Sequence, residues 1–133
     1  MKEARAIRKR GFSHTVEIRG GDHILTADEP RKEGGADEGP SPQELLAASL
    51  ASCSAVTLEM YADRKGWNIG HVTVAVSFEP AQRGSPTRFH IAVKLPKELP
   101  EDQRERLMQI VARCPVHRAL EGEVIFDEKM ELV

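Results

Sequence analysis

The 133-residue chain contains two cysteines, Cys53 and Cys114, and they are its strongest candidates for chemistry. A free cysteine is most often a buried packing residue, but as a thiolate it is a strong nucleophile. Two cysteines are too few for the disulfide framework of a small secreted domain. The pair is therefore either inert core or redox-active, and composition alone favours inert core.

Two thiols can together reduce a peroxide. A thiolate attacks the peroxide oxygen and becomes a sulfenic acid, which condenses with the second thiol to a disulfide. An external dithiol must then reopen the disulfide. The attacking sulfur has to be deprotonated, so a cation is expected beside it. Arg8, Arg10 and Arg19 in the N-terminal part of the chain are candidates, and Glu44 is a candidate carboxylate to hold the arginine.

Cys53 is predicted in the middle of a long helix that runs from Ser41 to Lys65. Ser41 can cap the free amides, Pro42 suits the first helical position, and Glu44 completes a capping box. Small residues flank Cys53 on both sides, so another group can approach its sulfur closely. The first half of the helix is apolar nearly all round, which predicts a buried position.

Cys114 is predicted at the C-terminal end of a second helix, from about Pro100 to Arg113, which Pro115 ends. The negative end of the helix dipole disfavours a thiolate there. Cys53 is therefore the predicted attacker and Cys114 the predicted resolving thiol. Both lie on apolar faces, so the sulfurs can meet if the helices pack together, although such faces equally suit inert burial.

The remaining segments predict an α+β fold with antiparallel sheets, because runs of strands are separated by helices. A loop with several glycines and prolines, Asp28 to Ser41, precedes the long helix, and loops of this length are usually functional or flexible. The length fits a single domain, residues 1–133. Strands are predicted at Ala4 to Lys9, Phe12 to Arg19, His23 to Ala27, His71 to Phe78, Phe89 to Leu95 and in Glu123 to Val133.

Composition argues against several classes of partner. The net charge of -2 and the 5% aromatic content give neither the basic field nor the stacking surface of a nucleic-acid-binding protein. No segment is expected to offer the roughly 18 apolar residues of a membrane span, and no signal sequence is recognised, so a cytoplasmic location is expected. Cys53, Cys114 and His117 lack the close spacing of a metal site, and no metal or cofactor is expected.

Two motifs resemble those of a known family. The first is GPSPQELLAASLASCSAVTL, from Gly39 to Leu58, and the second is Cys114-Pro115-Val116-His117. The predicted order of helices and strands also matches over nearly the whole chain. On these grounds the chain resembles the family of osmotically inducible protein C (OsmC) and organic hydroperoxide resistance proteins.

The resemblance implies an intertwined homodimer, with antiparallel sheets wrapped around two long central helices per chain and active sites at the interface. It implies a thiol peroxidase that reduces organic hydroperoxides and peroxide, with Cys53 peroxidatic and Cys114 resolving. The implied reductant is a dithiol of the lipoyl type. An arginine near an early strand turn, best matched by Arg10, would activate the thiolate and pair with a glutamate at the helix start.

The helix start departs from the pattern of the best-studied relatives. Gln43 stands where they carry the glutamate after the proline, and Glu44 comes one residue later, about 100° further round the helix. Glu44 therefore either reaches the arginine or serves only the capping box. The departure leaves open a second hypothesis, a small-molecule-binding or redox-sensing protein of this fold without efficient turnover. A purely structural dimer is a third.

Overall fold

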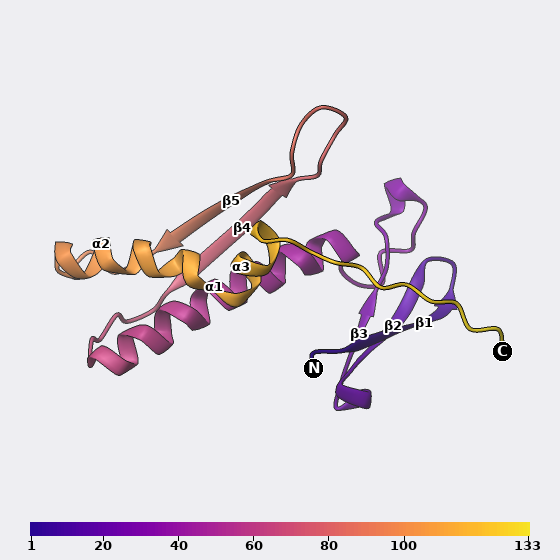
Figure 1. Cartoon of the computed structure of the whole chain (residues 1–133), viewed down its shortest axis with the longest axis horizontal. Coiled ribbons are helices and arrows are strands. Elements are labelled where there is room, and N and C mark those ends of the chain that lie inside the picture. Colours follow the sequence, from indigo (N-terminus) through magenta and orange to yellow (C-terminus); the bar gives the residue numbers. More distant parts are fainter. The chain divides into compact units, whose positions relative to one another are not determined.

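A computed structural model describes all residues, 1–133. The chain divides into two compact units, Met1–Ala47 and Ala48–Val133. The strands and helices, labelled in Figure 1, follow the predicted order as far as the second long helix. They are β1 Ala4–Arg10, β2 Ser13–Ile18, β3 His23–Ala27, α1 Pro42–Lys65, β4 Thr73–Glu79, β5 Arg88–Lys94, α2 Glu101–Ile110 and α3 Pro115–Glu121.

The first unit contains an antiparallel sheet in the order β1-β2-β3. Ala4 lies opposite Ile18 in the first pair, and His14 lies opposite Ala27 in the second. A short turn at Arg19–Gly21 joins β2 to β3. The three predicted strands and the turn between the second and third are confirmed. β2 alternates apolar and polar residues through Val16 and Ile18.

The loop between β3 and α1 has a defined, hydrogen-bonded backbone. The Asp28 amide donates to the Pro40 carbonyl at 3.1 Å and closes the loop at its base. A side chain at Gly35 would place its Cβ 1.9 Å from the Glu29 carbonyl oxygen, and one at Gly39 would lie 2.2 Å from that of Thr26. Glycine at these two positions lets the loop pack directly against β3 and its own first residues.

α1 begins as predicted. The Glu44 amide donates to Ser41 Oγ at 3.1 Å, and the Ser41 amide donates to Glu44 Oε1 at 2.9 Å. This is the reciprocal capping box, which satisfies two amides that the first turn leaves free. Gly66, at a φ of 70°, follows the last helical residue and ends the helix in the left-handed conformation that glycine favours.

The predicted burial of the first half of α1 is wrong for this chain by itself. Leu50 is its only buried residue there, whereas Leu46, Val56 and Met60 along the helix are 36%, 48% and 59% exposed. The expectation that no segment reaches membrane-span length was also wrong. α1 has 24 residues and an 18-residue stretch of mean hydropathy 1.4, which is enough to cross a membrane by length and composition. The central helix of a folded core meets the same criterion, so this is weak evidence for a membrane span.

The second unit holds the hairpin of β4 and β5, in which Phe78 and Phe89 lie opposite and stack with ring centroids 4.9 Å apart. Its core joins the C-terminal half of α1 to α2 and the segments that flank the hairpin. The buried members are Leu58, Tyr61, Ala62, Ile69, Leu99, Leu107, Ile110 and Val111. This core positions the middle of α1, and hence Cys53, against the region that follows α2.

The chain around Cys114 differs from the prediction. α2 ends at Ile110, a 3-10 turn covers Val111–Arg113, and Cys114 leaves the helical conformation with φ -54° and ψ 132°. Pro115 then occupies the first position of a third helix, α3. Proline ends one helix and also favours the start of the next. Cys114 therefore directly follows the C-terminal end of the second helical stretch, as predicted, and it is also the N-cap of α3, which was not predicted.

The C-terminal stretch Glu123–Val133 forms no strand in the single chain. A strand requires a hydrogen-bonded partner, and no other strand pairs with this stretch. Its apolar side chains are exposed: Val124, Ile125, Phe126, Met130, Leu132 and Val133. The predicted strands are therefore absent here.

Candidate active site

The two cysteines lie together in the second unit, although they are far apart in the sequence. Both are free thiols, and the side chain of Cys114 lies close enough to the Cys53 sulfur to shift its pKa. Cys53, in the middle of α1, is partly exposed, whereas Cys114 is 0% exposed. The predicted meeting of the two sulfurs is therefore observed, with only Cys53 open to an incoming molecule.

The surroundings of Cys53 favour the protonated thiol. Burial raises its pKa most, and the hydrogen bond and charge of Cys114 raise it further. The Val116 amide, which donates to the sulfur, acts in the opposite direction but does not outweigh them, and the Thr57 hydroxyl lowers the pKa least. That hydroxyl has a single proton and donates it to the Cys53 carbonyl at 2.8 Å. Deprotonation of Cys53 therefore requires a cation in addition to these groups.

α3, which the sequence analysis did not predict, supplies amides to both sulfurs. The Val116 amide donates to Cys53, and the His117 amide donates to Cys114 Sγ at 3.4 Å. The available signal was Pro115, because proline is over-represented at the first position of a helix. The same turn thus contacts both thiols.

His117 follows the second cysteine and lies in the first turn of α3. Its Nδ1 is buried without a hydrogen bond and lies 3.5 Å from Glu121 Oε2, one turn along α3. No group of three His, Cys, Asp or Glu side chains has an arrangement that could hold a metal ion. The residue is best described as packing beside the thiols.

The predicted arginine and glutamate both lie in the first unit, but they do not pair with each other. Arg10, at the end of β1, donates to the carboxylate of Glu38. Glu44 is committed to Ser41, whose amide and hydroxyl hydrogen bond to it and lower the pKa of its carboxyl. The structure therefore gives Glu44 the capping role, and its role in a reaction stays a prediction.

The other two candidate arginines have local partners. Arg8 Nε donates to the Gly11 carbonyl at 3.0 Å, across the turn between β1 and β2. Arg19 donates to His23 Nε2 at 2.6 Å, across the turn between β2 and β3. Arg10 alone among the three pairs with a carboxylate, and its role as the activating cation stays a prediction.

Asp28 is a buried carboxylate that the sequence analysis did not single out. It is 1% exposed and accepts the amides of Glu29, Ala36 and Glu38 at 2.7, 3.2 and 3.1 Å. Burial raises its pKa, but these three donors and the charge of Arg10 outweigh burial and lower the pKa overall. An aspartate directly before a glycine-rich loop was the available signal, since Asp side chains accept the amides of following residues.

The loop should therefore lose stability in acid. Because the native pKa of Asp28 is lowered, its charge stabilises the fold above the unfolded value of about 3.9 and ceases to do so as pH falls through the native value. Asp28→Asn is expected to lower the free energy of unfolding at pH 7, with a difference from wild type that shrinks below about pH 4. Urea unfolding at several pH values measures this, with exposed Glu33→Gln in the same loop as the control. A difference that is constant with pH would contradict the assignment.

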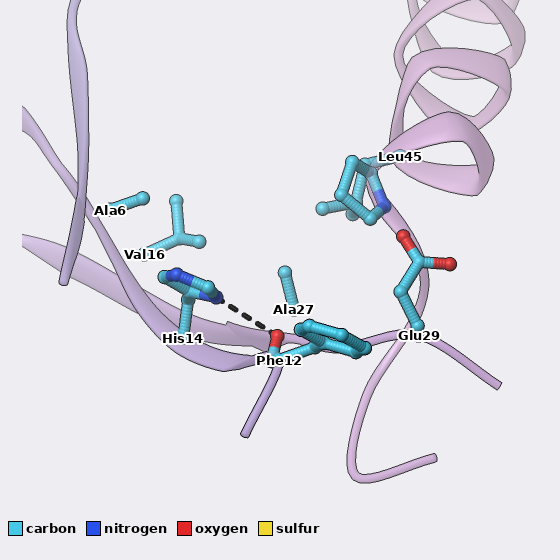
Figure 2. A pocket seen from close by; sticks show the side chains of 8 residues that line it. Ala6, Phe12, His14, Val16, Ala27, Glu29 and Leu45 are labelled. Carbon is cyan, nitrogen blue, oxygen red and sulfur yellow. Dashed lines mark hydrogen bonds between the residues drawn. The ribbon is translucent and has the colours of Figure 1, made fainter. Parts of the chain in front are cut away.

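The first unit also contains an apolar pocket of about 410 Å³ between its sheet and the start of α1. In Figure 2, Phe12, Ala27 and Leu45 face its interior, with the Glu29 carboxylate at one side. His14 Nδ1 lies 2.9 Å from the Phe12 carbonyl, which accepts a hydrogen bond from it, so the neutral ring keeps its other nitrogen as an acceptor. The volume is in the range of small-molecule sites.

The protein combines an α+β fold that has antiparallel sheets with two adjoining free thiols. These two features define its class as a protein with a thiol-based site. The family model described as OsmC-like protein matches residues 34–129. The chain therefore belongs to the OsmC-like protein family. It has no match among proteins with curated descriptions.

Solved structures of the family share the fold. An OsmC-like protein from Mycoplasma pneumoniae has a TM-score of 0.76 at 21% identity, covering 92% of this chain and 88% of that one. The organic hydroperoxide resistance protein OhrB of Bacillus subtilis has a TM-score of 0.63 at 20% identity, with coverages of 92% and 91%. An organic hydroperoxide resistance protein from Elizabethkingia anophelis has a TM-score of 0.66 at 23% identity, with coverages of 92% and 89%. At these identities the likeness shows the fold alone.

Proposed function

We propose that the protein is a two-cysteine thiol peroxidase that reduces organic hydroperoxides. The observation that carries the proposal is the free pair of adjoining thiols with unequal access. Cys53 is partly exposed and can meet a substrate, whereas Cys114 is fully buried beside it and can meet only Cys53. The names of solved relatives, which include organic hydroperoxide resistance proteins, support the same substrate class.

The proposed reaction proceeds in three balanced steps. The Cys53 thiolate attacks the terminal oxygen of the hydroperoxide and the O–O bond breaks. The departing alkoxide takes up a proton, equivalent to the one that the Cys53 thiol lost on ionisation, and leaves as an alcohol. The sulfenic acid on Cys53 then reacts with the Cys114 thiol, which forms the disulfide and releases water. A dithiol, of the lipoyl type by family resemblance, reduces the disulfide and restores both thiols.

Activation of Cys53 and assembly belong to the same proposal. Arg10 supplies the positive charge that stabilises the Cys53 thiolate. The active protein is a homodimer with sites at the interface. The exposed apolar residues of α1 and of the C-terminal stretch support a partner subunit, because a second chain would remove them from water. A reducing compartment, the cytoplasm, suits a cycle that starts from free thiols.

The reduced protein should lose both thiols when it is treated with one equivalent of cumene hydroperoxide. Mass spectrometry should find one disulfide between Cys53 and Cys114, because the buried thiol is already in contact with the reacting one. Dihydrolipoamide should then restore the two thiols. Persistence of both thiols over minutes would contradict the proposal.

A second candidate function is small-molecule binding without efficient turnover. The apolar pocket in the first unit favours it, since about 410 Å³ accommodates a small apolar ligand. The peroxide experiment separates the two functions. If binding is the function, the thiols persist while an apolar ligand raises the thermal midpoint by mass action.

A further inference from the structure

Arg10 has a carboxylate partner that comes from the loop and not from the helix. Its guanidinium donates to Glu38, 28 residues further along the chain. The side chain of Glu38 is 26% exposed and that of Arg10 is 66% exposed. An ion pair this exposed contributes little to stability, so its main effect is on where the guanidinium lies.

The loop holds Glu38 in place through Asp28. The buried Asp28 carboxylate accepts the backbone amide of Glu38 itself, together with those of Ala36 and Glu29. The Asp37 amide donates to the Glu29 carbonyl at 3.1 Å and adds a further cross-link. These hydrogen bonds therefore fix the backbone at Glu38, the residue whose side chain pairs with Arg10.

The helix start has no free carboxylate for Arg10. Gln43 is uncharged, and Glu44 accepts the Ser41 amide at 2.9 Å in the capping box. Turning Glu44 toward an arginine would leave that amide without its partner at the helix end, which is unfavourable. The carboxylate that does pair with Arg10 is Glu38 on the loop.

We propose that Glu38 is the positioning residue for Arg10 in this protein and that Asp28 anchors the loop that presents it. This inference rests on the proposed function, in which Arg10 activates Cys53. In this chain the carboxylate that orients the arginine thus comes from the loop before the helix, and not from the helix start as in the best-studied relatives. The departure at Gln43 is then compensated, and it does not imply an inactive protein.

The test compares Glu38→Gln, Glu38→Asp and Glu44→Gln for cumene hydroperoxide reduction, with Glu33→Gln as a control for charge in the same loop. Glu38→Gln is expected to lower kcat/KM by about tenfold or more, the usual effect of removing an orienting partner, and Glu38→Asp to recover part of it. Glu33→Gln should match wild type, because Glu33 is exposed and has no role in the site. Glu44→Gln is expected to cause a smaller loss of rate than Glu38→Gln and to lower the thermal midpoint.

A second readout separates positioning from folding. In a Cys114→Ser background, the pH midpoint for alkylation of Cys53 should rise in Glu38→Gln, because a misplaced Arg10 stabilises the thiolate less. Equal rates and midpoints for Glu38→Gln and Glu33→Gln, or a larger loss in Glu44→Gln, would overturn the inference. Failure of the wild-type protein to form the disulfide would instead overturn the proposed function.

Discussion

Replacing Cys53 with serine is expected to lower hydroperoxide reduction by about 10⁴-fold or more, because a serine hydroxyl cannot take the place of a thiolate nucleophile. Cys53 is the only accessible thiol, since Cys114 is 0% exposed. The exchange of sulfur for oxygen changes little in volume, so the fold should persist. The measurement is steady-state consumption of cumene hydroperoxide with dihydrolipoamide as reductant.

The matched variant Cys114→Ser should behave differently. It should retain one fast turnover and then stop, because the sulfenic acid on Cys53 has no thiol with which to condense. Dimedone, which traps sulfenic acids, should label Cys53 in this variant and not in wild type. Dimedone labelling of Cys114 in Cys53→Ser, with turnover retained, would reverse the assigned roles.

Local signals made the start of α1 predictable from the sequence. Ser41, Pro42 and Glu44 form a helix start whose contacts lie within three residues, and the structure confirms it. The strands were predictable for a similar reason, since alternation of apolar and polar residues reflects one buried face. The pairing of the two thiols was foreseen only as a consequence of helix packing, and α1 and the turn at α3 do bring them together.

Contacts between distant residues were not predictable in the same way. No pattern near Arg10 indicates that Glu38 is its partner, because the fold of the loop around Asp28 determines it. Pro115 was interpreted as the end of a helix although it is also the start of one, since proline is compatible with both. The predicted C-terminal strand is absent because no strand of the chain pairs with Glu123–Val133, and local sequence does not show whether a strand will find a partner.

Replacing Leu107 with alanine is expected to lower the free energy of unfolding by about 2–5 kcal/mol and the thermal midpoint by roughly 10 °C. Leu107 is 0% exposed and packs from α2 into the core that also contains Leu58 and Tyr61 of α1. The loss combines the transfer of apolar surface with the cavity that remains. Since this core places Cys53 on α1 near Cys114, the variant should also form the disulfide more slowly. Urea unfolding and thiol loss after hydroperoxide treatment measure the two effects.

The neighbouring Met108→Ala is the control, because Met108 is 52% exposed on the same helix. Its effect on the free energy of unfolding should stay within about 0.5 kcal/mol, as for most surface substitutions. The comparison keeps helix propensity and position almost constant and varies only burial. Equal losses in the two variants would mean that both side chains are buried in solution, which would contradict the assigned core face of α2. A large loss for Leu107→Ala alone supports a core within the second unit that fixes the geometry of the two thiols.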